Sequence, residues 1–227
     1  MRASTVPRWT CIVVLLCAGV LPLAGQQRLE QRLDAPTIAA LRPLFELARR
    51  DSVPVAALED KALEGAAKRI PPERIVAAVQ QLARDLRDAR GLLRGARPRG
   101  PISDGEILAA ADAPRRGVPA AEIAALGAHA PPAMSLLVPL TVLGDLVQRG
   151  IPAAEARRVI EELLGAGISP EQLAEIPPRV DVALRVGAQP REAFFNALPI
   201  PVRPPIPQRP PPGPPPAQSI RVGSPTP

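Results

Sequence analysis

Apolar residues recur at helical spacing through most of this chain, and the clearest example runs from Pro72 to Arg94. Its apolar positions alternate steps of four and three residues, which places them on one face of a helix. These positions are Ile75, Val79, Leu82, Leu86, Ala89 and Leu93. No stretch shows convincing two-residue alternation of the kind a strand requires, so the pattern predicts an all-α protein.

Short turn signals separate the helical stretches. A glycine or basic residue is followed by Ile or Val, then by proline, and then by the next helix, as at 117–119 and 150–152. Glycine can end a helix in the left-handed conformation, and proline suits the first helical position. Prolines of this kind are often 17 to 20 residues apart. We therefore expect a compact array of short helices with irregular helix-turn repeats, either solenoid-like or an irregular bundle.

These signals also set the limits of the predicted helices, which make up one helical domain over residues 37–198. Ser103 and Glu106 have the spacing of a capping box at one helix start. The segment 26–36 is polar, and we expect it to be flexible. The predicted helices are Thr37–Arg50, Pro54–Lys68, Pro72–Arg94, Asp104–Ala113, Pro119–Ala128, Ala133–Arg149, Pro152–Gly165, Pro170–Ile176, Arg179–Val186 and Pro190–Leu198.

A stretch of 22 uncharged residues runs from Ile123 to Gly144. A membrane-spanning helix needs about 20 apolar residues without a break, and Pro131 and Pro132 interrupt this stretch. Proline lacks an amide hydrogen and restricts the residue before it, so we predict that one helix ends and the next begins there. The second helix is apolar on nearly every side, which is typical of a helix enclosed by others.

The two ends of the chain differ from the helical part in composition. Residues 1–25 have a basic start, an apolar run from Cys11 to Leu21 and small residues at Ala24 and Gly25, the layout of a secretory signal peptide. We expect cleavage near Ala24 or Gly25 and a periplasmic or secreted protein without a membrane span. An uncleaved N-terminus that anchors the protein in the inner membrane is the alternative.

The C-terminal segment 199–227 contains 13 prolines in 29 residues and is expected to be a disordered, extended tail. Within it, Pro204, Pro207 and Arg209 have the Pro-x-x-Pro-x-Arg spacing of ligands for SH3-type grooves. A spacer, or a stretch that lies along envelope polymers, is the simpler interpretation.

Composition limits the available chemistry. The chain has 28 basic and 22 acidic residues, and loss of Arg2 and Arg8 with the signal would lower the net charge from +6 to +4. Both cysteines would leave with the signal, and His129 is the one histidine, which argues against an imidazole or thiolate metal site. His129 is expected at a helix end, near free carbonyls. Because aromatic residues are scarce, nucleic-acid binding is disfavoured.

Basic and acidic residues cluster in several places. The run from Arg94 to Gly100 is the densest positive patch, read either as a flexible basic loop between two helical halves or as a site for an anionic envelope polymer. Candidate carboxylate pairs also have nearby arginines, which favours salt-bridged helix surfaces over catalysis. These pairs are Glu155 with Glu162, Glu161 with Glu162, and Glu171 with Glu175. We assign no catalytic, cofactor-binding or metal-binding residue and expect no cofactor.

Two segments, Lys61 to Leu86 and Arg149 to Ser169, carry a resemblance. They are similar to segments of uncharacterised secreted bacterial proteins built from Gly-[Ile/Val]-Pro helical units, and the likeness covers roughly Pro54 to Ala197. The resemblance implies an all-helical fold and export, and it transfers no site.

Together these features suggest an exported, non-enzymatic helical protein that binds or scaffolds in the cell envelope. The expected partner is an envelope protein or an anionic envelope polymer. The alternative is a carboxylate-based hydrolytic or lytic enzyme in the periplasm or outside the cell.

Overall fold

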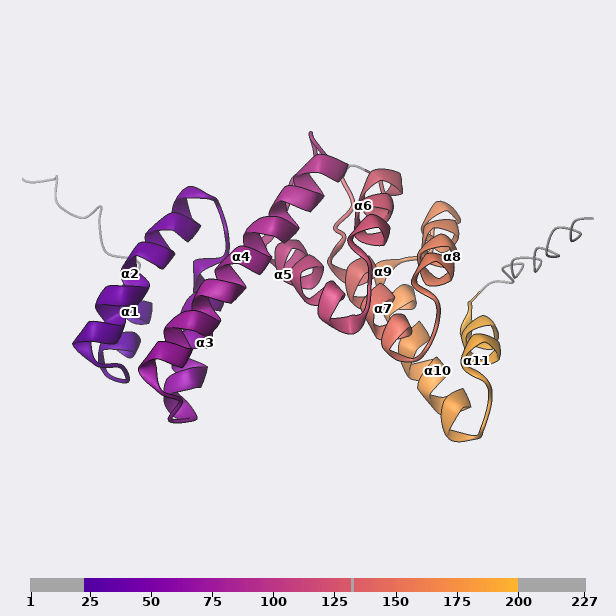
Figure 1. Cartoon of the computed structure of the whole chain (residues 1–227). Helices are drawn as coiled ribbons and strands as arrows, with labels where there is room; N and C mark the ends of the chain where they lie inside the picture. Colours follow the sequence, from indigo (N-terminus) through magenta and orange to yellow (C-terminus); the bar gives the residue numbers. More distant parts are fainter. Residues whose placement is uncertain (1–22, 132, 200–227) are drawn as a thin grey trace, which may run out of the picture.

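The computed structural model describes residues 23–131 and 133–199, and this part of the chain is all-helical (Figure 1). Residues 1–22 of the predicted signal peptide (1–25) and residues 200–227 of the predicted tail (199–227) lie outside the described residues, whereas residues 23–25 form the start of α1. The helices are α1 (Leu23–Glu30), α2 (Ala35–Arg50), α3 (Val55–Ala67), α4 (Pro72–Ala96), α5 (Asp104–Asp112), the 3-10 helix η1 (Ala113–Arg116), α6 (Ala120–His129), α7 (Leu137–Gln148), α8 (Ala153–Gly165), α9 (Pro170–Ala174), α10 (Ile176–Arg185) and α11 (Pro190–Ala197).

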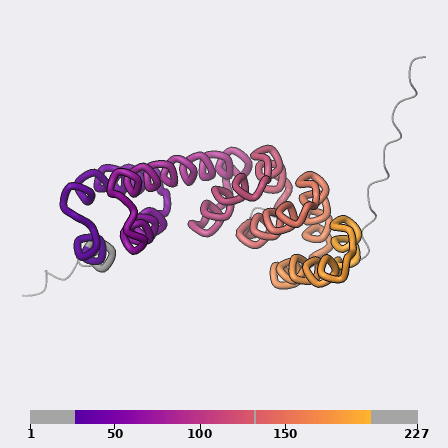
Figure 2. Tube along the Cα trace, turned by 60° about the horizontal axis from the view of Figure 1, so that its bottom comes forward, coloured from indigo at the N-terminus to yellow at the C-terminus, as the bar shows by residue number. Residues whose placement is uncertain are grey.

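The helices follow one another through space in nearly the order of the sequence. Helices α1 to α3 lie at one end of the array and α10 and α11 at the other (Figures 1 and 2). Helix α4 has 25 residues, or about 37 Å at 1.5 Å per residue, and packs against α2, α3, α5 and α6. Helix α7 packs against α5, α8, α9 and α10. These two helices therefore connect the ends of the array.

The turns between helices repeat one geometry. At Gly150, φ is +87°, and the amide of the next residue, Ile151, donates to the Leu146 carbonyl over 3.1 Å. This bond to the carbonyl five residues earlier defines the Schellman motif. Ser52 and Arg69 take the positive φ at the two such turns that lack glycine. The same amide bond is made by Val53, Ile70, Val118, Ile168 and Ala188. The predicted role of glycine in these turns is confirmed, because Gly117, Gly150, Gly167 and Gly187 all have positive φ.

The uncharged stretch forms two helices and the loop between them. Helix α6 ends at His129, and α7 begins at Leu137, four residues after the predicted start at Ala133. Helix α7 buries residues on most of its surface, which confirms that other helices enclose it: Pro139, Leu140, Val142, Leu143, Gly144 and Leu146. Within residues 23–131 and 133–199, no helix is both long and apolar enough to cross a membrane.

The segment expected to be flexible, 26–36, is instead mostly structured. It contains most of α1, in which Leu29 is buried, and the start of α2. Asp34 caps α2, because its carboxylate accepts the Thr37 amide over 3.0 Å. The polar composition of the segment concealed a buried side chain, Leu29, a partly buried one, Leu33, and a capping residue, Asp34.

Candidate functional site

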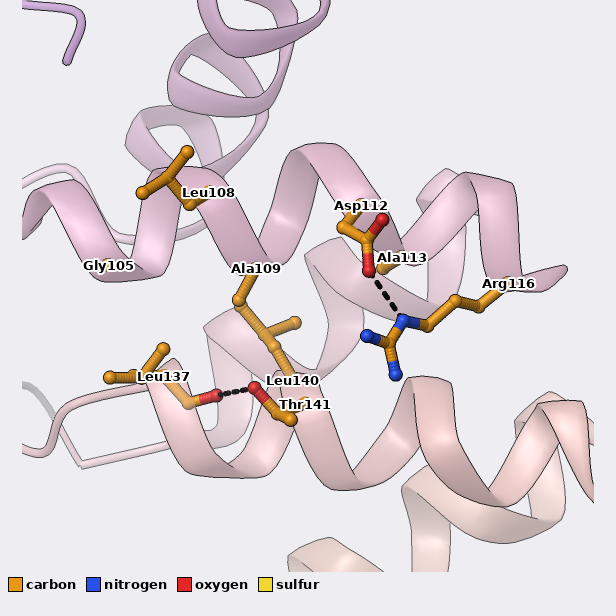
Figure 3. A pocket seen from close by; sticks show the side chains of 9 residues that line it. All are labelled: Gly105, Leu108, Ala109, Asp112, Ala113, Arg116, Leu137, Leu140 and Thr141. Atoms are coloured by element: carbon orange, nitrogen blue, oxygen red, sulfur yellow. Dashed lines mark hydrogen bonds and ion pairs between the residues drawn. The ribbon is translucent and has the colours of Figure 1, made fainter. Parts of the chain in front are cut away.

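The candidate site is a groove between α5 and α7, with a volume of about 260 Å³ (Figure 3). Its most exposed large side chains are apolar: Leu108 on α5 is 40% exposed and Leu137 on α7 is 42% exposed. We call this the α5/α7 groove. It is lined by Gly105, Leu108, Ala109, Asp112, Ala113, Arg116, Leu137, Leu140 and Thr141.

The groove exists because α5 turns only one side toward α4. The neighbouring residues Ile107, Ala110 and Ala111 are buried, whereas Leu108 lies off that face. Gly105 lets α7 approach, since a Cβ at this position would lie 3.3 Å from Leu137 Cδ2. The sequence did not reveal the site, because neither leucine differs from a core leucine until the positions of the helices are known.

One end of the groove is charged. Arg116 donates from Nε to the Asp112 carboxylate over 2.5 Å and also pairs with Asp145 on α7. The bond to Asp112 raises the pKa of Arg116, and attraction to Asp145 adds to it, although burial opposes the shift. Two carboxylates share one guanidinium here, and Arg149 also attracts Asp145.

A second acidic residue lies on the same face of α5. Asp104 is four residues before Leu108, and Asp112 is four residues after it. Residues four apart lie one above the other on a helix. The exposed leucine is therefore flanked along the helix by two aspartates.

A buried ion pair holds the start of α5 against the loop that precedes α7. Arg97 Nη1 lies 3.0 Å from Glu106 Oε1, and only 5% of each side chain is exposed. Arg97 also donates to the Met134 carbonyl over 2.9 Å, and Glu106 accepts the Leu136 amide over 2.7 Å. These bonds join the start of α5 to the loop that precedes α7, and so they position both walls of the groove.

Glu106 has two structural roles. It completes the predicted capping box, because Ser103 donates from its amide and hydroxyl to the carboxylate over 2.7 and 2.9 Å. Burial acts to raise the pKa of Glu106, but the bonds from Leu136, Ser103 and Arg97 together outweigh it and hold the pKa below its usual 4.5. The carboxylate is therefore ionised at neutral pH.

The basic run from Arg94 to Gly100 is not the flexible loop expected from its composition. Arg97 is 6% exposed and takes part in the buried pair. Arg94 donates to the carbonyls of Pro98 and Gly100 over 3.2 and 3.1 Å. Two of the three arginines thus stabilise the chain itself, and the run is a structured turn.

Each acidic residue of the predicted carboxylate pairs has its own local partner. Glu171 is held by the hydroxyl of Ser169, which lowers its pKa. The others pair with arginine: Glu155 with Arg191 at 2.9 Å, Glu161 with Arg157 at 2.6 Å, Glu162 with Arg158 at 3.2 Å, and Glu175 with Arg179. These contacts favour salt-bridged helix surfaces over a pair of carboxylates that converge on a substrate.

His129 is the last residue of α6. Its Nδ1 lies 2.8 Å from the Ala125 carbonyl and 3.4 Å from Glu161 Oε1. This contact with a carbonyl of its own helix agrees with the expected role at a helix end. Across the part of the chain that the structure describes, no group of three or more His, Cys, Asp or Glu side chains could hold a metal ion.

Comparison of the chain with protein-family models, with curated proteins and with solved structures finds no match. The functional argument therefore depends on the geometry of the α5/α7 groove and on the composition of the chain.

Proposed function

We propose that this chain is an exported, non-enzymatic helical protein that acts by binding in the cell envelope, and that the α5/α7 groove receives its partner. The observation that carries the proposal is the pair of leucines, Leu108 and Leu137, each about 40% exposed on neighbouring helices. Isolated apolar side chains on a surface are ordinary, but these two line one groove and together offer an apolar surface to a partner's side chain.

The size of the groove suggests what binds there. At about 260 Å³ it is smaller than most small-molecule pockets, which measure roughly 300–1,000 Å³. One or two side chains of a protein partner fit this volume. Asp104, which is exposed one turn before Leu108, favours a partner with a basic residue beside its apolar one. A segment of an envelope protein fits this description better than an anionic polymer does.

The groove walls are fixed before binding. Glu106 accepts the Leu136 amide just before α7 begins. Thr141 donates its hydroxyl to the Leu137 carbonyl over 2.8 Å, a bond marked by a dashed line in Figure 3. A site that is already ordered loses less conformational entropy on binding. This supports a binding role for the groove.

Photocrosslinking in cells tests the proposal. A benzophenone amino acid replaces Leu108 or Leu137, and a control protein carries it at Val182, an α10 residue that is 56% exposed. We expect a specific covalent adduct with an envelope protein from the two groove positions and none from position 182. Equal labelling at all three positions, or no adduct from the groove, would refute the proposed site.

Export is tested separately. N-terminal sequencing of the protein recovered from the periplasm or medium is expected to begin at Gln26 or Gly25. A protein that keeps residue 1 and stays with the inner membrane would instead support the anchored alternative.

A further inference from the structure

The walls of the α5/α7 groove are two helices that run in the same direction. A Cβ at Gly105 would lie 3.3 Å from Leu137 Cδ2, and one at Gly144 would lie 2.7 Å from Arg116 Cδ. The start of α5 therefore lies beside the start of α7, and η1 lies beside the second half of α7. From Gly105 to Ala113 the groove follows α5 for about 12 Å at 1.5 Å per residue. This length corresponds to about two turns of an α-helix.

The groove offers few free hydrogen-bonding groups to a bound backbone. Three of its lining side chains are polar, and each already bonds a neighbour in the protein. Arg116 donates from Nε to Asp112 over 2.5 Å and also pairs with Asp145. Thr141 donates its hydroxyl to the Leu137 carbonyl. Within each wall, the backbone groups of the helix interior bond to one another along the helix.

These walls suit a ligand that satisfies its own backbone. A buried amide or carbonyl without a partner costs free energy, and an extended peptide carries both at every residue. Peptides that bind as strands avoid this cost by pairing with the edge of a sheet. The part of the chain that the structure describes contains no strand to supply such an edge. An α-helix has its backbone bonds within itself and needs none from the groove.

The one charge at the open end of the groove places a requirement on the ligand. Asp104 is exposed and lies one turn before Leu108 on α5. A basic side chain on the ligand is complementary to it. On a ligand helix that packs along α5, this basic residue lies three or four positions from the apolar residue that contacts Leu108, because residues at that spacing share one face.

We propose that the partner enters the α5/α7 groove as an amphipathic α-helix, with its apolar side chains against Leu108 and Leu137 and a lysine or arginine one turn away beside Asp104. The inference rests on the proposed function, because it names the form of the segment that occupies the same groove. The bound helix is a third helix packed on α5 and α7, and helix-on-helix packing is also what holds the array together.

Reverse crosslinking measures the periodicity of the bound segment. The partner segment is first captured from positions 108 and 137. A benzophenone amino acid is then placed at successive positions of that segment, one in each variant, and each is irradiated with the full chain. We expect adducts on peptides that contain Leu108 or Leu137 to recur every three or four positions. Yields that alternate at every second position indicate an extended strand and would overturn the inference.

A proline substitution tests the helix independently. Proline replaces one residue in the middle of the captured segment, at a position that gave no adduct, and alanine at the same position is the matched control. Proline interrupts a helix, whereas alanine favours it. We expect the proline variant to reduce crosslinking from position 108 at least tenfold and the alanine variant to retain it. Equal crosslinking of the two variants is incompatible with a helical ligand.

Neutralisation of Asp104 tests the position of the basic residue. Asp104→Asn should lower capture at position 137 about two- to fivefold, the scale of one exposed ion pair. The control is Glu73→Gln, which removes an exposed acidic residue from the first turn of α4 and so has the same effect on a helix terminus. Capture should be unchanged in this control. Equal capture by the two variants would overturn the contact with Asp104.

Failure of this inference can be distinguished from failure of the proposed function. If positions 108 and 137 capture no partner, the proposed site and the helical ligand are both wrong. If they capture a segment whose adducts alternate at every second position, the site stands and only the helical form of its ligand is overturned.

Discussion

Replacement of Glu106 by Gln tests whether the buried Arg97–Glu106 pair holds α5 to the loop before α7. The carboxylate of Glu106 accepts from Arg97 Nη1 and the Leu136 amide on one oxygen, and from the Ser103 amide and hydroxyl on the other. A glutamine amide carries one oxygen and one NH₂ group. The NH₂ group cannot accept, so at least one backbone amide loses its acceptor, and the Arg97 charge stays buried without its counter-charge.

The expected cost follows from that geometry. Removing one partner of a buried ion pair costs about 3–5 kcal/mol, because the other charge stays desolvated. Both side chains here are only 5% exposed, which puts the pair in that class. Arg97→Met should cost less, since Glu106 keeps the Leu136 and Ser103 donors. The double variant should be more stable than the sum of the single effects predicts, by about 1–3 kcal/mol.

Urea unfolding followed by circular dichroism at 222 nm measures these free energies. A matched control is Glu162→Gln, whose partner Arg158 lies at 3.2 Å with both side chains well exposed. An exposed pair contributes little, so the control should change stability by less than about 1 kcal/mol. A loss below about 1 kcal/mol in Glu106→Gln, or strict additivity in the double variant, would refute the reasoning.

Three further outcomes are expected. The pKa of Glu106 is lowered in the folded state, so its contribution to the free energy of unfolding is fully present above about pH 4.5. This contribution is lost as the pH falls through the folded pKa. Unfolding curves of the wild type and Glu106→Gln should therefore converge in acid. Gly167, with φ +80°, and Gly91, inside α4, both have open space around them. Thermal melts should show Gly167→Ala less stable by about 1–2 kcal/mol, because alanine is strained at positive φ, and Gly91→Ala more stable by up to about 1 kcal/mol, because alanine favours the helix. Equal effects of the two substitutions would contradict the left-handed turn. Ala109→Leu should fill the groove and reduce crosslinking of the partner from position 137 without loss of thermal stability. The control Ala128→Leu, on the exposed side of α6, should leave this crosslinking unchanged.

Local signals were sufficient to predict the α-helices from α2 onward and the turns between them, but not α1. Each Schellman turn depends on a few consecutive residues, as at Gly150 and Ile151, so its geometry is encoded where it occurs. The stripe on α4 and the capping box at Ser103 are of the same kind. Expectations were wrong where a single residue outweighed the average composition of its segment. Leu29 in α1 is one such residue, and Arg97 in the basic run is another.

The sequence by itself determined an all-helical chain divided by proline and glycine, because backbone preferences and helical periodicity act over a few neighbouring residues. Only the tertiary structure decided that Arg97 would be buried against Glu106 and that Leu108 and Leu137 would stay exposed in one groove. Burial and pairing depend on which helices meet. Leu137 lies 29 residues after Leu108, and their place in one groove is set by the packing of α5 on α7.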